Sequence, residues 1–219
     1  VGGIATVFLN GAELGQNTGS YKRFSFELPG IEAGTACDLV VHFDDRDPRI
    51  PRGKPKQLSG IWQTVWMEPV PESYISSFRL TTDIDTGQVP LDVLIEGGSS
   101  DLSLVATAHD SGEEFDAVQV PCGERLVLNI PAPRTWTPEI PFLYDLMLEL
   151  RKGDEVVDRV ESYFGMRKIA RAEVDGAQRI LLNNEVYYQA GLLDQGQWPE
   201  SFFTPPSDES LVWEIEQTK

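Results

Sequence analysis

The sequence lacks the residue patterns of disulfide-stabilised and metal-binding proteins. Only two of its 219 residues are cysteines, Cys37 and Cys122, and they lie far apart and form no spaced pair. A disulfide framework or a cysteine metal site needs partners at short, regular spacings. We therefore expect a buried free thiol at each position. The two histidines, His42 and His109, are also isolated, so we expect no metal ligands and no cofactor.

Long apolar runs and positive charge are also scarce. No run reaches the roughly 18 apolar residues of a membrane-spanning helix. The chain has 18 Lys and Arg against 35 Asp and Glu, a net charge of −17. An acidic surface repels phosphate backbones, so we expect no nucleic-acid partner. Because a long apolar run is missing, we also expect no membrane partner. The excess carboxylates mainly keep the protein soluble. The first residue is not Met, and the first residues contain no basic n-region and no apolar signal core. Localisation is therefore unreadable, and the abrupt ends predict a piece of a longer protein.

The first 70 residues carry the alternating pattern of antiparallel β-strands. Asn10-Gly11 follows a short apolar run and predicts a tight hairpin turn, because both residues tolerate positive φ. Apolar and polar residues alternate over residues 21–28, 39–43 and 60–68. The polar, proline-broken segment 44–55 lies between the last two and predicts a loop.

A second β series begins near Tyr74, after Pro69 and Pro71. The expected strands cover residues 75–81, 91–96, 102–109, 125–130, 144–150 and 156–163. Turn sequences such as Asp85-Thr86-Gly87 and Lys152-Gly153-Asp154 separate them. Short strands at this spacing predict a β-sandwich of immunoglobulin-like size.

The pattern changes again after Arg167. Asp175-Gly176 and Asn183-Asn184 predict turns on either side of a short apolar strand at 180–182. The denser apolar run 186–193 predicts a strand buried on both faces. Ser207 is the expected N-cap of an amphipathic helix that continues to the last residue. A buried strand, a loop and a helix form the first step of an α/β domain.

Five segments in order resemble the glycoside hydrolase family 2 enzymes, the β-galactosidase and β-glucuronidase family. The segments are FLNGAELG at 8–15, SGIWQTVWMEPV at 59–70, WTPEIPFLY at 136–144, YFGMRKI at 163–169, and LNNE at 182–185 followed by Ala190-Gly191. The resemblance implies a mainly β fold: a partial sugar-binding jelly roll (1–72), an immunoglobulin-like β-sandwich (73–168), and the first strand and helix of a (β/α)8 barrel (169–219).

The resemblance also implies hydrolysis of β-glycosidic bonds with retention, which needs two carboxyl groups about 5–5.5 Å apart. In the family both are glutamates on later barrel strands, and no acidic residue here lies in a matching segment. We therefore expect no catalytic residue in this chain and an inactive fragment. The implied partner is a carbohydrate, a β-glycoside whose sugar is undetermined.

Four residues are candidates for substrate binding. Asp45 lies in the loop that, in the family, reaches toward the active site. Asp194, Gln195 and Trp198 follow the first expected barrel strand, and such loops open on the catalytic face of a barrel. The carboxylate and amide suit sugar hydroxyls, and the indole suits a sugar's apolar face. A charged tip of a surface loop for Asp45, and packing beneath its own loop for Trp198, are the alternatives.

A second hypothesis is a non-catalytic β-sandwich module that binds carbohydrate or protein. The segment from Tyr163 to Lys219 favours the enzyme, because a binding module has no reason to carry the start of a barrel.

Overall fold

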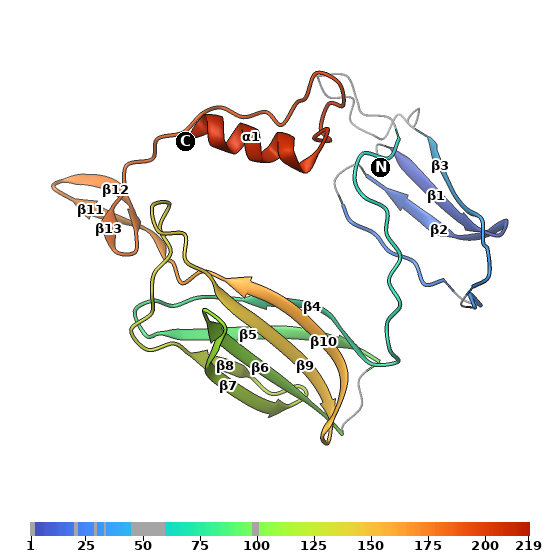
Figure 1. Ribbon diagram of the computed structural model, residues 1–219. Helices are drawn as coiled ribbons and strands as arrows, with labels where there is room; N and C mark the ends of the chain where they lie inside the picture. Colours follow the sequence, from blue (N-terminus) through green and yellow to red (C-terminus); the bar gives the residue numbers. More distant parts are fainter. Residues whose placement is uncertain (1–2, 20–21, 29, 33, 45–59, 98–100) are drawn as a thin grey trace. The chain divides into compact units, whose positions relative to one another are not determined.

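The computed structural model describes residues 3–19, 22–28, 30–32, 34–44, 60–97 and 101–219, and it is mainly β (Figure 1). The chain divides into two compact units: unit 1 is Val1–Met67 with Leu192–Lys219, and unit 2 is Glu68–Gly191. The strands are β1 Ile4–Leu9, β2 Ala12–Thr18, β3 Leu39–Asp44, β4 Tyr74–Leu80, β5 Gln88–Glu96, β6 Leu102–Asp110, β7 Glu113–Pro121, β8 Leu126–Asn129, β9 Tyr144–Lys152, β10 Glu155–Phe164, β11 Ile169–Val174, β12 Ala177–Leu182 and β13 Glu185–Val186. Among the described residues, no helix is long and apolar enough to cross a membrane.

Unit 1 contains a three-stranded antiparallel sheet in the order β2-β1-β3. The expected turn at Asn10-Gly11 is confirmed, with φ of 49° and 82°. The turn is also tied to the residue before β3, since the Asp38 N–H donates to Asn10 Oδ1 at 2.9 Å. Alternate residues of β1 are buried, namely Ala5, Val7 and Leu9. Strand β1 therefore buries one of its faces, whereas Leu39 and Phe43, opposite it on β3, are 46% and 41% exposed.

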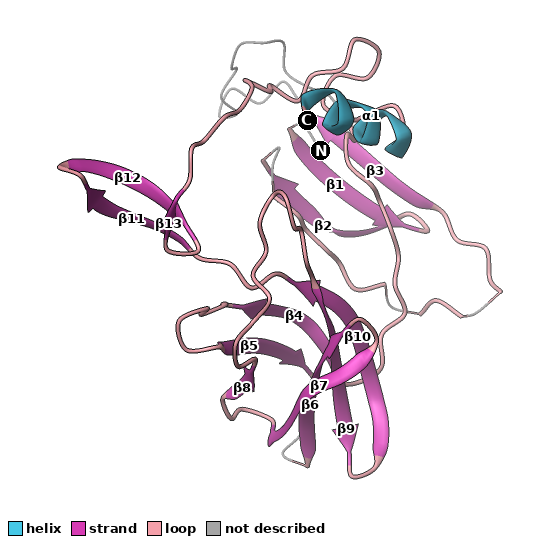
Figure 2. Cartoon of the chain, turned by 60° about the vertical axis from the view of Figure 1, so that its left-hand side comes forward, coloured by secondary structure: helices cyan, strands magenta, loops and turns pink. Residues whose placement is uncertain are grey.

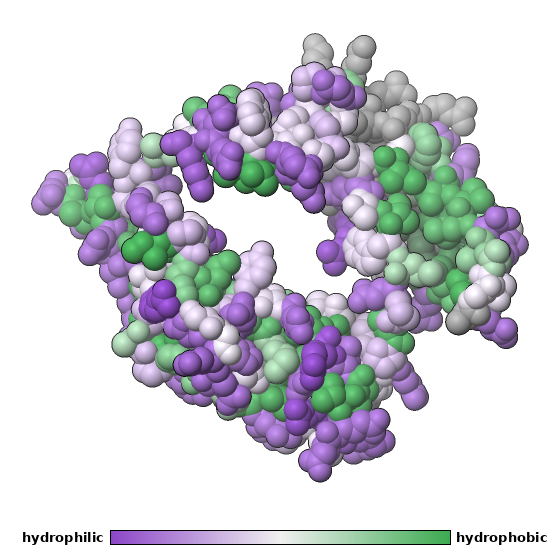
Figure 3. Space-filling model, viewed as in Figure 1, coloured by the Kyte–Doolittle hydropathy of each residue, from purple (hydrophilic) through white to green (hydrophobic). Residues whose placement is uncertain are grey.

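Two other alternating segments of unit 1 do not form strands. Residues 22–28 bury Phe24, Phe26 and Leu28 partly and expose the residues between them, but they form no ladder. In residues 61–68, Val65, Trp66 and Met67 are all more than half exposed. Figure 3 shows hydrophobic side chains gathered on the surface of this unit. The expectation of strands here is wrong, because alternation creates a strand only where a neighbouring strand accepts its hydrogen bonds.

Unit 2 contains a β-sandwich of two antiparallel sheets, ordered β10-β9-β6-β7 and β4-β5-β8. Figures 1 and 2 show them as two facing layers. All six expected strands are present, as β4, β5, β6, β8, β9 and β10. The sequence reading missed β7. Its signals were the turn Ser111-Gly112, with φ of 55° and 88°, and the alternation of Val118 and Val120 with exposed neighbours.

The core of unit 2 lies between these two sheets. The inward residues of β9, Tyr144, Leu146, Leu148 and Leu150, are at most 1% exposed. Tyr144 stacks on Phe164 at a centroid distance of 5.4 Å and meets Phe142 edge-on at 4.9 Å. Its hydroxyl accepts a hydrogen bond from the Arg134 backbone N–H at 2.9 Å. The polar end of this buried ring is therefore satisfied, as burial of a tyrosine requires.

A small antiparallel sheet, β11-β12-β13, follows the sandwich within unit 2 (Figure 2). Both expected turns are confirmed, with positive φ at Asp175-Gly176 (55° and 73°) and at Asn183-Asn184 (52° and 71°). The expected buried strand over 186–193 is wrong. Only Glu185–Val186 is a strand, and Leu192 and Leu193 are 75% and 86% exposed. A strand buried on both faces needs paired neighbours on both sides. Among the described residues, the ladder to β12 ends at Val186, and only the Tyr187 N–H extends it, with one bond to the Ile180 carbonyl at 3.1 Å.

Helix α1, Asp208–Thr218, is present in unit 1 with the expected N-cap. Ser207 has extended φ and ψ, and its hydroxyl accepts from the Ser210 N–H at 3.3 Å. Acidic residues occupy the first turn, where their negative charge interacts favourably with the positive end of the helix dipole. No residue of the helix is buried.

The expectation of two buried thiols is only partly met. Both cysteines are free, but Cys122 is half-buried and Cys37 is exposed. Burial raises the pKa of the Cys122 thiol.

Candidate functional site

The loop with three of the four candidate residues is shaped by its own polar groups. Asp194 Oδ1 accepts a hydrogen bond from the Gly196 N–H at 2.6 Å. This bond to the residue two positions ahead forms an Asx-turn, and Gly196, with φ of 60°, supplies the left-handed residue. Asp194 and Gln195 are exposed. Their side chains can therefore reach a ligand in solvent.

Trp198 lies at the base of a second, wider turn in the same segment. It exchanges two backbone hydrogen bonds with Phe202: the Trp198 N–H donates at 2.6 Å and the Phe202 N–H donates at 3.0 Å. Phe202 has φ of 57°, which closes the turn. Trp198 itself is half-buried. The Trp198 backbone is therefore held in the turn, and its side chain is partly accessible.

The residues after this turn attach to the 60–67 segment of unit 1. The Phe203 and Trp62 rings meet edge-on at a centroid distance of 6.2 Å, and Thr204 Oγ1 donates to the Trp62 carbonyl at 2.7 Å. Trp62 lies in the 59–70 motif and is not among the four residues that the sequence predicts for the site. The aromatic residues in both segments were the feature of the sequence that could have indicated this contact.

The structure brings Asp194, Gln195 and Trp198 into one exposed segment. Asp45 lies outside the described residues. The arrangement offers a carboxylate, a carboxamide and a nearby indole, which are hydrogen-bonding and stacking groups suited to a polyhydroxylated ring. Their role in substrate binding stays a prediction. Among the described residues, no three His, Cys, Asp or Glu side chains are placed to hold a metal ion.

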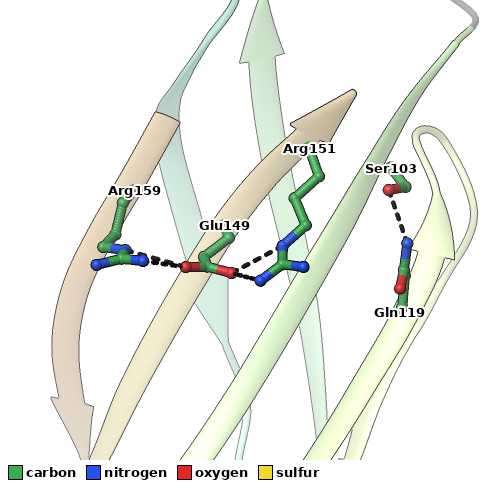
Figure 4. A network of polar contacts seen from close by, with 5 residues as sticks. All are labelled: Ser103, Gln119, Glu149, Arg151 and Arg159. Carbon is green, nitrogen blue, oxygen red and sulfur yellow. Dashed lines mark hydrogen bonds and ion pairs between the residues drawn. The ribbon is translucent and has the colours of Figure 1, made fainter. Parts of the chain in front are cut away.

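The most buried carboxylate belongs to unit 2 and is a structural group (Figure 4). Glu149 is 2% exposed, and it points to the outer side of β9, away from the core. Its Oε1 accepts from Arg159 at 3.0 and 2.6 Å, and its Oε2 accepts from Arg151 Nε at 2.8 Å and from Arg151 Nη2. Figure 4 also shows the separate bond from Gln119 to Ser103, 2.9 Å long.

The pKa of Glu149 reflects two opposing effects. Burial raises the pKa, and the hydrogen bonds and charges of Arg151 and Arg159 lower it by more, so the net pKa lies below the ordinary value of 4.5. Both oxygens are occupied by guanidinium groups. Glu149 is therefore held as an anion and has no free oxygen with which to act as an acid or a nucleophile.

The comparison with protein families gives one match. Residues 73–167, which form the sandwich described above, match the family model "Glycosyl hydrolases family 2". This domain is similar to glycosyl hydrolase family 2. The resemblance drawn from the sequence motifs is thereby confirmed.

Two relatives of this chain, both of low sequence identity, are named as glycosidases. A beta-galactosidase of Bacteroides ovatus is 23% identical over 179 residues, covering 74% of this chain and 21% of that protein. A beta-glucuronidase of Formosa agariphila is 23% identical over 201 residues, covering 75% of this chain and 20% of that protein. The chain therefore spans about a fifth of the length of these curated relatives.

A solved structure shares the fold. The beta-glucuronidase of Ruminococcus gnavus, in complex with an N1-substituted uronic isofagomine, superposes with a TM-score of 0.79 at 16% identity. The match covers 99% of this chain and 40% of that one. At this identity the likeness establishes the mainly β fold.

Proposed function

We propose that this chain is part of a retaining β-glycosidase that hydrolyses O-glycosyl bonds, with the two catalytic carboxyl groups outside the 219 residues. The match of residues 73–167 to glycosyl hydrolase family 2 carries the proposal. Retaining hydrolysis needs a proton donor and a nucleophile about 5–5.5 Å apart. Glu149, the most buried carboxylate described, is held by two arginines and cannot serve.

In this proposal the sandwich is a scaffold and the 194–198 loop contacts the sugar. Asp194 and Gln195 accept and donate hydrogen bonds to hydroxyl groups, and Trp198 stacks on the apolar face of the ring. Asp45 contributes a carboxylate from the other candidate loop. The three predicted domains, 1–72, 73–168 and 169–219, belong to the same proposal: a sugar-binding jelly roll, the scaffold and the start of the catalytic barrel.

The test compares the 219-residue chain with the complete protein on a panel of aryl β-glycosides. The panel includes a β-glucuronide and a β-galactoside, because relatives carry both names. We expect hydrolysis with retained configuration by the complete protein and none by the 219-residue chain. Turnover by the short chain would mean that its own carboxylates catalyse, and inverted product would contradict the retaining mechanism.

A non-catalytic binding module is the second candidate. The continuous core between the two sheets favours it, because such a sandwich does not depend on a barrel for its stability. A complete protein that binds the glycosides of the panel by calorimetry but cleaves none of them would select this candidate.

A further inference from the structure

The small sheet β11-β12-β13 has almost no core of its own. Ile169, Ile180 and Val186 are 64%, 47% and 53% exposed, and Leu182 is buried at 6%. A sheet of two six-residue strands and one two-residue strand is marginal in water unless it packs on something else. Its order therefore depends on the contacts that attach it to the sandwich.

Those contacts converge on the Asn183-Asn184 turn. Asn183 Oδ1 accepts from the Lys168 N–H at 3.0 Å, and Asn183 Nδ2 donates to the Trp136 carbonyl at 3.0 Å. Asn184 Nδ2 donates to Asp85 Oδ1 at 2.7 Å. The Lys168 ammonium pairs with Asp85 Oδ2. Asp85 thus uses one oxygen for the turn and the other for the linker that leads into β11.

Asp85 is itself fixed by the sandwich. Asp83 Oδ1 accepts from the Asp85 and Thr86 N–H groups at 2.9 and 3.3 Å. Gly87 closes the same turn with φ of 71°, and a Cβ there would lie 2.5 Å from the Ile130 carbonyl oxygen. The turn between β4 and β5 is therefore clamped against the end of β8, and it presents the Asp85 carboxylate in one orientation.

A second contact lies beyond the turn. The Tyr187 hydroxyl donates to Glu139 Oε1 at 2.8 Å, and this bond lowers the pKa of Glu139 and raises that of Tyr187. A body held at one point can pivot about it, whereas a body held at two points resists most rotations. The two contacts together restrict the sheet on the sandwich.

We propose that Asp85 is a latch that fixes β11-β12-β13 to the sandwich and makes residues 68–191 one rigid body. The sheet, the linker and Tyr187 then keep a set orientation on the sandwich. With the latch open, the small sheet loosens while the sandwich stays folded. The inference goes beyond the glycosidase proposal and does not depend on it.

Amide hydrogen exchange of the whole 219-residue chain, read by mass spectrometry, tests the latch without substrate. Asp85→Asn keeps the side-chain shape and removes the charge. We expect peptides covering 169–186 to exchange roughly two- to fivefold faster, the effect of losing an exposed charged pair, and peptides of β9 to keep their rates. Asn184→Gly keeps the positive φ and removes only the amide donor, so it should act in the same direction.

Asp175→Asn is the matched control, because it makes the same charge change at the other end of the β11–β12 hairpin. We expect wild-type rates in this variant. Equal rates in Asp85→Asn and wild type would overturn the latch. Equal acceleration of β9 and of 169–186 would also overturn it, because Asp85 would then support the sandwich as a whole. Both results are independent of whether the complete protein hydrolyses a glycoside.

Discussion

The two units of this chain use similar apolar alternation and bury it to different extents. Unit 2 places its alternating residues between two paired sheets, and its core side chains are nearly all inaccessible. In the described part of unit 1 the buried hydrophobic residues are Ala5, Val7 and Leu9, and the apolar side chains of 61–67 and of α1 are largely exposed. Alternation of apolar and polar residues indicates which side chains share one face of a strand. That face becomes a buried core only where a second sheet packs against it.

The comparison predicts that unit 2 carries the stability of the chain. Leu148→Ala removes an inaccessible side chain from the central strand β9, and we expect a loss of about 2–5 kcal/mol in the free energy of unfolding of the sandwich. Leu211→Ala makes the same change at a 39% exposed position of α1, and we expect about 0.5 kcal/mol or less. Native-state hydrogen exchange measures both losses, with the β6 and β9 amides reporting on Leu148→Ala and the α1 amides reporting on Leu211→Ala. Equal losses would remove the distinction between the units.

The buried charge on the sandwich gives the next largest effect. Glu149→Gln keeps the volume but breaks the charge-assisted bonds to Arg151 and Arg159. We expect a loss of about 2–3 kcal/mol at pH 7. This is less than for a fully buried pair, because the Arg159 side chain is 52% exposed. Glu161→Gln, an exposed position on β10, is the matched control and should have little effect.

The Glu149 effect should depend on pH with a definite sign. The folded-state pKa lies below the ordinary value of 4.5, so the ionised carboxylate stabilises the fold fully above about pH 4.5. That contribution is lost as the pH falls through the folded-state pKa. The difference between wild type and Glu149→Gln, measured as the free energy of unfolding, should shrink as the pH falls below about 4.5. A constant difference would show that the charge is not its source.

The proposed glycosidase function adds a prediction to this comparison, namely that unit 1 carries the contacts to substrate. In the complete protein we expect Trp198→Ala to lower kcat/KM roughly tenfold, about 1.4 kcal/mol, the order of one good aromatic contact, and Asp45→Ala to lower it as well. Sandwich stability should stay unchanged in both. Trp213→Ala, an exposed tryptophan of α1 in the same unit, is the control. Wild-type kinetics in Trp198→Ala, or an equal loss in Trp213→Ala, would remove Trp198 from the site.

Local chemistry decided which parts of this fold the sequence could predict. The turns at Asn10-Gly11, Asp175-Gly176 and Asn183-Asn184 and the Ser207 cap depend on neighbouring residues, and all were predicted correctly. The strand over 186–193 depends on pairing partners, and that prediction was wrong. The partners of Glu149 also depend on register, because Arg159 lies opposite it on β10. The candidate loop 194–198 could be located only through the resemblance to family 2, as the segment that follows the expected first barrel strand.

The smallest of these predicted stability effects is at the N-cap of α1, a helix that buries none of its residues. The 11-residue helix gains little from packing, and isolated helices of that length are marginal. Its N-cap bond from Ser210 N–H to Ser207 Oγ therefore matters more than it would in a buried helix. We expect Ser207→Ala to cost about 1 kcal/mol of helix stability, visible as faster exchange of the α1 amides, with β9 amides unchanged. Ser207→Asp should restore the rates, because aspartate caps as well as serine and adds favourable charge at the helix N-terminus. Unchanged exchange in Ser207→Ala would mean that packing, and not the cap, holds α1, which would make unit 1 more like unit 2 than its exposed side chains indicate.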